Sequence, residues 1–341
     1  MKNKKIISIA GLPLLVLLWF GPLPARAAGP GDLLVPLGET VGIDLTFPGA
    51  VVSGYAEIRS DGETLCPARE AGIRPGDRIT AVDGVNVADG RDFMAKAAGF
   101  SGAPVTLTLR RDGRELTAAV TPVRNEQGSW QLGLWLRDAV RGIGTVTFYD
   151  PAQGRYGALG HGVSAPESRE LLPVSGGSVT RAVVADVVPG RAGEPGELCG
   201  AAGEGILGTV ESNTPQGLFG RWTAPAPSAP AVPAAADDEI CPGPAELLST
   251  VDGSGPRRFS AQILRVDRSG GRVRQLTISV TDPELLALTG GIVQGMSGSP
   301  ILQNGKLVGA VTHVLVSDPS KGYGISAENM LAAAEALLPA A

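Results

Sequence analysis

The sequence predicts a mainly β protein, and its length of 341 residues indicates about two domains. It holds 48 glycines and 27 prolines, and only 4% of its residues are aromatic. Runs rich in β-branched residues recur between glycine or proline positions, whereas long amphipathic helical patterns are scarce. The formal net charge is −5, so the overall charge does not indicate nucleic acid as a partner.

The N-terminus has the features of a targeting segment. Lys2, Lys4 and Lys5 precede an apolar stretch at residues 6–20, and Ala25-Arg26-Ala27 offers small residues at signal-peptidase spacing. The stretch is shorter than the roughly 20 residues that span a bilayer comfortably. We therefore expect an exported, membrane-associated chain whose residues 1–28 are either a cleaved signal peptide or a membrane anchor.

Residues 33–123 form the first predicted domain. A short helical segment is expected at residues 91–98, and alternating strands at residues 105–110 and 116–123 are joined across Asp112-Gly113. Ahead of them lies the run Ala71-Gly72-Ile73-Arg74-Pro75-Gly76-Asp77-Arg78-Ile79-Thr80-Ala81-Val82-Asp83-Gly84. This run closely resembles PDZ domains.

The PDZ resemblance implies a peptide-binding loop. It assigns Val41, Gly42 and Ile43 as the residues whose N–H groups receive a peptide carboxylate, while the peptide adds to the sheet as a strand. The alternative is that the PDZ fold serves only as a rigid spacer.

Residues 133–336 form the second predicted domain, a β-barrel of short strands and glycine turns. A strand at residues 146–149, a turn, and a returning strand at residues 155–159 deliver Gly160-His161-Gly162 at a strand end. Residues 222–245 are rich in Pro and Ala, and we interpret them as an exposed, mobile insertion within this domain.

The hexapeptide Gly295-Met296-Ser297-Gly298-Ser299-Pro300 is the most informative motif. Apolar-rich runs on either side of Asn304-Gly305 predict a hairpin directly after it. Ser297 then lies on an exposed turn, and the N–H groups of Gly295 and Ser297 are the natural donors of an oxyanion hole. Hexapeptide and hairpin together resemble the nucleophile segment of trypsin-like serine peptidases, which implies a double β-barrel.

Few residues can complete a catalytic site with Ser297. Of the two histidines, His161 is the better general base, because flanking glycines let its side chain reach a cleft. His313 follows on the strand that leaves the nucleophile hairpin, where it forms either the wall of a specificity pocket or a packed core residue. Asp282, at the end of a strand, is the expected triad acid, and Asp186 is its rival.

Two histidines without a paired motif cannot build a usual zinc site, so we expect neither a metal nor another cofactor. The three cysteines, Cys66, Cys199 and Cys241, are odd in number. One disulfide and one free thiol are compatible with an oxidising compartment, and the sequence does not select the pair.

Four segments carry a more specific resemblance: residues 142–149, 156–161, 281–286 and 289–324. With them, roughly residues 33 to 333 resemble the stage IV sporulation protein B peptidase family of spore-forming bacteria. The resemblance implies a serine peptidase with His161, Asp282 and Ser297 as its triad.

The same resemblance implies a place and a role. The peptidase would be exported into the space between the forespore and mother-cell membranes and would cleave itself near its N-terminus. It would also cleave the membrane-bound regulator of an intramembrane metalloprotease and so trigger pro-sigma-K processing, with a forespore inhibitor protein as a further candidate partner. The alternative is a PDZ-containing binding or signalling protein with an inactive peptidase-like domain.

Overall fold

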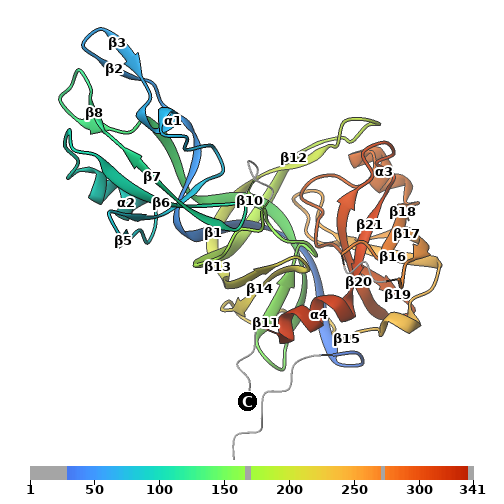
Figure 1. The fold of residues 1–341 in the computed structure, drawn as a ribbon. Coiled ribbons are helices and arrows are strands. Elements are labelled where there is room, and N and C mark those ends of the chain that lie inside the picture. Colours follow the sequence, from blue (N-terminus) through green and yellow to red (C-terminus); the bar gives the residue numbers. More distant parts are fainter. Residues whose placement is uncertain (1–28, 166–169, 270–272, 337–341) are drawn as a thin grey trace, which may run out of the picture.

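The computed structural model describes residues 29–165, 170–269 and 273–336, which form two β-barrels and a PDZ domain (Figure 1). The predicted signal peptide or anchor at residues 1–28 lies outside the described residues. None of the helices within the described ranges is long and apolar enough to cross a membrane. The predicted mainly β fold, with a PDZ domain and a trypsin-like double barrel, is confirmed.

Six antiparallel strands close the N-terminal barrel, because β1 pairs with both β10 and β12. The ring runs β1–β10–β11–β14–β13–β12 and returns to β1. Its strands are β1 (Leu33–Tyr55), β10 (Leu134–Asp150), β11 (Arg155–Ala158), β12 (Gly176–Val188), β13 (Glu197–Thr214) and β14 (Gly217–Trp222).

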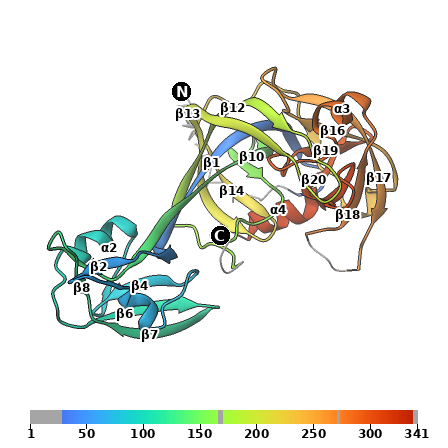
Figure 2. The same ribbon diagram turned by 90° about the horizontal axis from the view of Figure 1, so that it is seen from above.

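The PDZ domain is inserted between the first two strands of this barrel. The two strands β1 and β10 run out of the barrel as a ribbon, still paired at Val51–Arg137 and Tyr55–Leu134, and the PDZ domain lies at its far end (Figure 2). Its further elements are β2 (Ile58–Ser60), β3 (Glu63–Leu65), α1 (Pro67–Glu70), β4 (Arg78–Val82), β5 (Val85–Asn86), α2 (Gly90–Ala97), β6 (Val105–Arg111), β7 (Arg114–Val120), β8 (Val123–Arg124) and β9 (Trp130–Gln131).

This insertion corrects the expected start of the PDZ domain at residue 33. The first half of β1 belongs to the N-terminal barrel, since Val41 pairs with Gly144 on one side and with Arg181 on the other. The assignment of Val41, Gly42 and Ile43 as a carboxylate-binding loop is therefore wrong. These residues lie in a strand that is paired along both edges, so their N–H groups cannot receive a peptide terminus.

The C-terminal barrel closes in the order β16–β17–β18–β21–β20–β19. The turn between β19 and β20 has left-handed backbone at Asn304 (φ +52°) and Gly305 (φ +76°), as the Asn-Gly pair predicts. The elements of the C-terminal barrel are β16 (Gly243–Ser249), β17 (Arg257–Val266), β18 (Leu276–Val280), α3 (Pro283–Thr289), β19 (Pro300–Gln303), β20 (Lys306–Val314), β21 (Lys321–Ser326) and α4 (Ala327–Glu335).

The segment between Trp222 and Gly243 is the connection between the barrels, so its interpretation as an insertion within one domain is wrong. Most of residues 223–231 are exposed, as expected, but the rest of the segment is partly buried. It contains β15 (Val232–Pro233), which pairs with the start of β1, and a short 3₁₀ helix, η1 (Asp237–Glu239). Its residues Ala234, Ala235 and Ile240 are at most 1% exposed. Small apolar side chains let this segment pack closely against the barrels, which its composition alone does not reveal.

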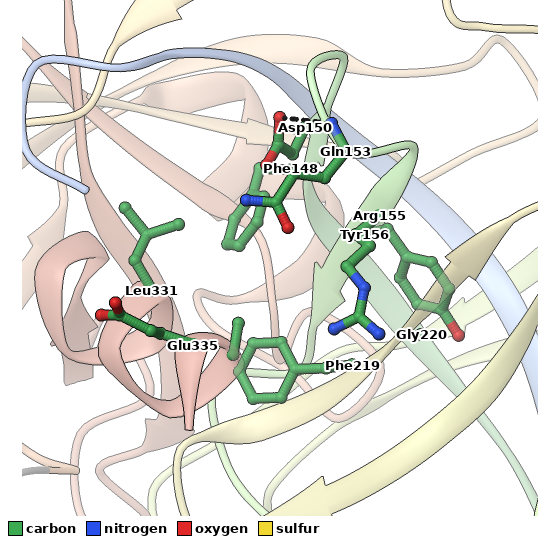
Figure 3. A pocket seen from close by; sticks show the side chains of 10 residues that line it. Phe148, Asp150, Gln153, Arg155, Tyr156, Phe219, Gly220, Leu331 and Glu335 are labelled. Atoms are coloured by element: carbon green, nitrogen blue, oxygen red, sulfur yellow. Dashed lines mark hydrogen bonds between the residues drawn. The ribbon is translucent and has the colours of Figure 1, made fainter. Parts of the chain in front are cut away.

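Helix α4 packs the two barrels together. Met330 and Leu331 share a buried cluster with Phe148 and Phe219 of the N-terminal barrel and with Ile325 of β21. A small cavity of about 20 Å³ lies beside this contact. It is lined by residues of β10, β11, β14 and α4 and of the turn between β10 and β11 (Figure 3). Neither Ser297 nor His161 lines this cavity, so it is not the candidate active site.

Candidate active site

The nucleophile loop lies where the barrels meet, and only glycine fits directly after Ser297. Gly298 has a φ of +97°, and a Cβ there would lie 2.0 Å from the carbonyl oxygen of Thr145 on β10. Thr145 also donates its N–H to the Ser297 carbonyl at 2.9 Å. The Ser297 hydroxyl donates to the carbonyl of Thr312 on β20 at 2.9 Å. A strand from each barrel therefore holds the loop.

The two N–H groups predicted to form the oxyanion hole belong to Gly295 and Ser297. Neither donates a hydrogen bond to any residue that the structure describes, whereas the N–H groups of Met296, Gly298 and Ser299 are all engaged. An oxyanion hole requires such donors beside the nucleophile, because they must meet the charge that develops in the transition state. The geometry is thus compatible with the role predicted for both residues.

His161 lies just after β11 and is oriented by the backbone. Its Nδ1 lies 2.9 Å from the carbonyl oxygen of Gly162. Because a carbonyl only accepts hydrogen bonds, Nδ1 carries the proton and Nε2 is left as the basic nitrogen. A Cβ added at Gly160 would lie 3.1 Å from Cγ2 of Thr312, the residue whose carbonyl accepts the Ser297 hydroxyl. The base segment and the nucleophile therefore meet at Thr312.

The second histidine, His313 on β20, stacks against His161. Their ring centroids are 4.9 Å apart, and Nδ1 of His313 is buried without a hydrogen-bond partner among the described residues. Arg274, whose guanidinium lies over the ring of Tyr323, is the nearby cation. The role of His313 as the wall of a specificity pocket stays a prediction.

The pKa of each imidazole lies below the ordinary value for histidine. Burial is the main cause that lowers the pKa of His161; the Gly162 carbonyl opposes it in part, and Arg274 adds to it. Burial, His161 and Arg274 together lower the pKa of His313 to about 4. Burial and a nearby cation thus both favour the neutral form of the candidate base, and no acidic group among the described residues favours its charged form.

The structure does not bring Asp282 to His161. Asp282 caps the N-terminus of α3: its carboxylate accepts the N–H groups of Glu284 at 3.0 Å, Leu285 at 3.1 Å and Ser260 at 3.1 Å. Burial raises the pKa of Asp282, but these three hydrogen bonds outweigh it, so the pKa lies below the usual carboxyl value. In this conformation Asp282 is a structural cap.

Among the described residues, no carboxylate takes the place of Asp282 beside His161. Asp186, the rival acid, is exposed on β12, opposite Cys199. Within the described part of the chain, no acidic side chain hydrogen-bonds to His161 or shifts its pKa. Ser297 Oγ and His161 Nδ1 each bond to a backbone carbonyl, so no hydrogen bond between members of the predicted triad is seen among the described residues, and the triad stays a prediction.

Sequence reasoning missed Asn213 and Arg274. The Asn213 amide accepts from the Val163 N–H at 2.8 Å and donates to the Val163 and Leu172 carbonyls at 2.7 and 2.8 Å. It thus fixes the segment that follows His161. The turn signal Asn213-Thr214-Pro215 was the one available hint. Arg274 had none, because its approach to both histidines depends on how the barrels meet.

A second candidate site lies on the PDZ domain. A groove of about 820 Å³ runs between α2 and residues 130–136, and Met94 (63% exposed) and Trp135 (64% exposed) line it. Residues 134–136 of β10 pair with β1 on one edge, and their other edge has no strand partner among the described residues. An extended peptide can add to such an edge, so this groove replaces the loop wrongly assigned at residues 41–43.

The role of Asp282 can be tested with a substitution that keeps a side-chain oxygen for the N-cap but removes the negative charge. Asp282→Asn retains an N-cap, whereas loss of the charge of a triad acid lowers kcat by about 10⁴-fold. We expect Asp282→Asn to retain kcat within a few-fold. Asp282→Ala should lose about 1 kcal/mol of unfolding free energy, and activity with it, because α3 leads directly into the nucleophile loop. A collapse of kcat in Asp282→Asn with unchanged stability would restore Asp282 as the triad acid.

The pH dependence of hydrolysis shows whether a carboxylate reaches His161 in the working enzyme. Since burial and Arg274 lower the pKa of His161, the acidic limb of kcat/KM should be centred below the ordinary histidine value of 6.5. Arg274→Gln should move this limb toward higher pH, and Arg265→Gln, an exposed arginine on β17, serves as the control. A limb centred at pH 7 or above would show that a carboxylate does reach the imidazolium.

Comparison with known proteins identifies both parts of the chain. Residues 128–331 match the family described as SpoIVB peptidase S55, and residues 60–121 match the PDZ domain family. Two provisionally named zinc metalloproteases are also similar. The protein from Mesorhizobium japonicum is 39% identical over 88 residues, which cover 26% of this chain and 23% of that protein. The protein from Clostridium perfringens is 36% identical over 86 residues, which cover 25% and 26%.

The chain therefore spans about a quarter of the length of these metalloproteases. Within the described residues, no group of three His, Cys, Asp or Glu side chains could hold a metal ion.

Two solved structures are similar at low identity. Rv3671c from M. tuberculosis is 18% identical with a TM-score of 0.34, covering 58% of this chain and 84% of that one. The HtrA-type protease AlgW is 15% identical with a TM-score of 0.33, covering 61% and 56%. The family match spans more than half of the chain and includes Ser297 and His161. The chain belongs to the SpoIVB peptidase S55 family and is a serine peptidase with an inserted PDZ domain.

Proposed function

We propose that this serine peptidase is an exported endopeptidase of spore formation. It acts in the space between the forespore and mother-cell membranes, cleaves itself, and cleaves the membrane-bound regulator of an intramembrane metalloprotease, which triggers pro-sigma-K processing. The family match over residues 128–331 supports this role. The observation that supports the catalytic proposal is the nucleophile loop. The N–H groups of Gly295 and of Ser297 itself have no acceptor among the described residues.

In the proposed mechanism the Ser297 hydroxyl turns from the Thr312 carbonyl toward His161. Nε2 of His161 accepts the proton while Oγ attacks the peptide carbonyl carbon, and the Gly295 and Ser297 N–H groups bind the oxyanion. The imidazolium returns its proton to the leaving amine, and water then hydrolyses the acyl-enzyme by the same steps. Proton abstraction should be slow until an acidic group offsets Arg274. We therefore propose that an acidic substrate side chain beside His313 favours cleavage.

The PDZ groove gives the peptidase a way to retain a protein substrate. We propose that an extended segment of the regulator, or of the chain itself, adds to the open edge of residues 134–136. Because β10 continues from this edge into the peptidase barrel, binding there raises the local concentration of the substrate near Ser297.

Active-site labelling tests the catalytic part. We expect a fluorophosphonate probe to label the wild-type protein on Ser297, and Ser297→Ala to abolish both labelling and cleavage of the co-expressed membrane-bound regulator. His161→Ala should remove most turnover as well. A wild-type protein that binds the regulator but is neither labelled nor able to cleave it would favour the alternative, a binding protein with an inactive peptidase-like domain.

Substitution in the groove tests the PDZ part. Met94→Lys places a charge on the apolar groove wall and should weaken binding of a regulator peptide about tenfold. It should also slow cleavage of the intact regulator but not of a short fluorogenic peptide. Val85→Lys, at a residue of similar exposure (59%) outside this groove, is the matched control. Equal effects of the two variants would count against a role for the groove.

A further inference from the structure

The peptide unit between Gln294 and Gly295 decides whether the first oxyanion donor points toward the substrate. All described peptide bonds are trans, so the Gln294 carbonyl and the Gly295 N–H point in opposite directions. Gly295 has a φ of +95°. Glycine rotates freely between backbone regions, so this peptide unit would turn easily if nothing held it.

The holding group comes from the other barrel. The tip of the β12–β13 hairpin reaches across to the nucleophile loop, where Leu198 donates its N–H to the Gln294 carbonyl at 2.9 Å. Gln294 in turn donates its N–H to the Gly196 carbonyl at 2.8 Å. The bond from Leu198 fixes the Gln294 carbonyl toward the β12–β13 hairpin, so the Gly295 N–H must face away from that hairpin.

The hairpin tip is itself anchored on the C-terminal barrel. Gly190 donates to the Thr289 carbonyl at 2.8 Å, and Gly193 donates to the Val316 carbonyl at 2.8 Å. The Leu198 side chain is 5% exposed and belongs to the buried cluster of that barrel. A Cβ at Gly295 would lie 3.1 Å from the Leu198 Cβ, so hairpin and loop are in direct contact.

Thr145 holds the opposite side of Gly295. Its hydroxyl donates to the Gly295 carbonyl at 2.8 Å, and the residue is fully buried. This carbonyl belongs to the peptide unit between Gly295 and Met296, which lies between the two peptide units that carry the oxyanion donors. Both backbone rotations at Gly295 are thereby restrained, one by Leu198 and the other by Thr145.

We propose that Leu198 and Thr145 are positioning residues that keep the oxyanion hole formed, and that undocking of the β12–β13 tip would switch it off. Neither residue touches the reacting atoms; both act through Gly295. The proposal rests on the proposed role of Ser297 as nucleophile. It adds that the N-terminal barrel supplies the hydrogen bonds that make the nucleophile loop catalytic.

Paired variants separate the hydrogen bonds from packing. Leu198→Pro removes the N–H, whereas Leu198→Ala keeps the N–H and removes only side-chain packing. On a fluorogenic peptide, Leu198→Pro should lower kcat about 10²- to 10³-fold with little change in KM, the effect of losing one oxyanion donor. Leu198→Ala should lower the thermal midpoint of unfolding but keep kcat within a few-fold.

A second set does not alter the backbone. Thr145→Val keeps the side-chain shape and should also lower kcat with KM retained, and Thr145→Ser should restore it. Thr147→Val is the matched control, because Thr147 donates the same kind of bond from β10 to Gly298, beyond the segment between the two donors.

The outcomes are distinguishable from those for the nucleophile. Wild-type kcat in both Thr145→Val and a folded Leu198→Pro, with Ser297 labelled normally, would overturn the proposal and leave the proposed function intact. A kcat in Thr147→Val as low as in Thr145→Val would also overturn it, because the loss would then be general to the strand. If fluorophosphonate does not label the wild-type protein, the proposed function itself is overturned, and with it the role of Ser297 on which this proposal rests.

Discussion

The contact between strand β10 and the nucleophile loop is the constraint on which the site depends. One buried residue, Thr145, donates its N–H to Ser297 and its hydroxyl to Gly295, and its carbonyl accepts the Leu159 N–H two residues before His161. Hydrogen bonds from one residue of β10 therefore hold the segments that carry the nucleophile, the oxyanion donor and the base. Because that strand belongs to the N-terminal barrel and Ser297 to the C-terminal one, neither barrel alone can form the site.

The same strand links the site to the PDZ domain. Its first residues form the open edge of the groove, and its later residues hold the nucleophile loop. An inserted domain on a two-stranded ribbon differs from a domain on a flexible linker, because the paired strands restrict where a bound segment can lie. The fold thus places the groove proposed to capture substrate and the nucleophile loop at two ends of one continuous strand.

Local patterns were enough to predict the nucleophile hairpin, the strand end that carries His161, and the helix and strands of the PDZ domain. The sequence could not show that β1 closes the first barrel, because its partners in β10 and β12 lie far downstream and pairing of this kind has no local signature. Asp282 is the instructive case. An aspartate followed by proline and glutamate is a local signal for a helix N-cap, and weighing it would have predicted the role that the structure shows.

The central claim is that hydrogen bonds from the N-terminal barrel preform the oxyanion hole. A crystal structure of the fluorophosphonate adduct of Ser297 tests it most directly. We expect a phosphonyl oxygen within about 2.7–3.1 Å of the Gly295 and Ser297 nitrogens. The Gln294 carbonyl should still accept the Leu198 N–H, and the Gly295 carbonyl should still accept the Thr145 hydroxyl. An adduct whose phosphonyl oxygen is held elsewhere, or whose Gln294 carbonyl has left Leu198, would contradict it.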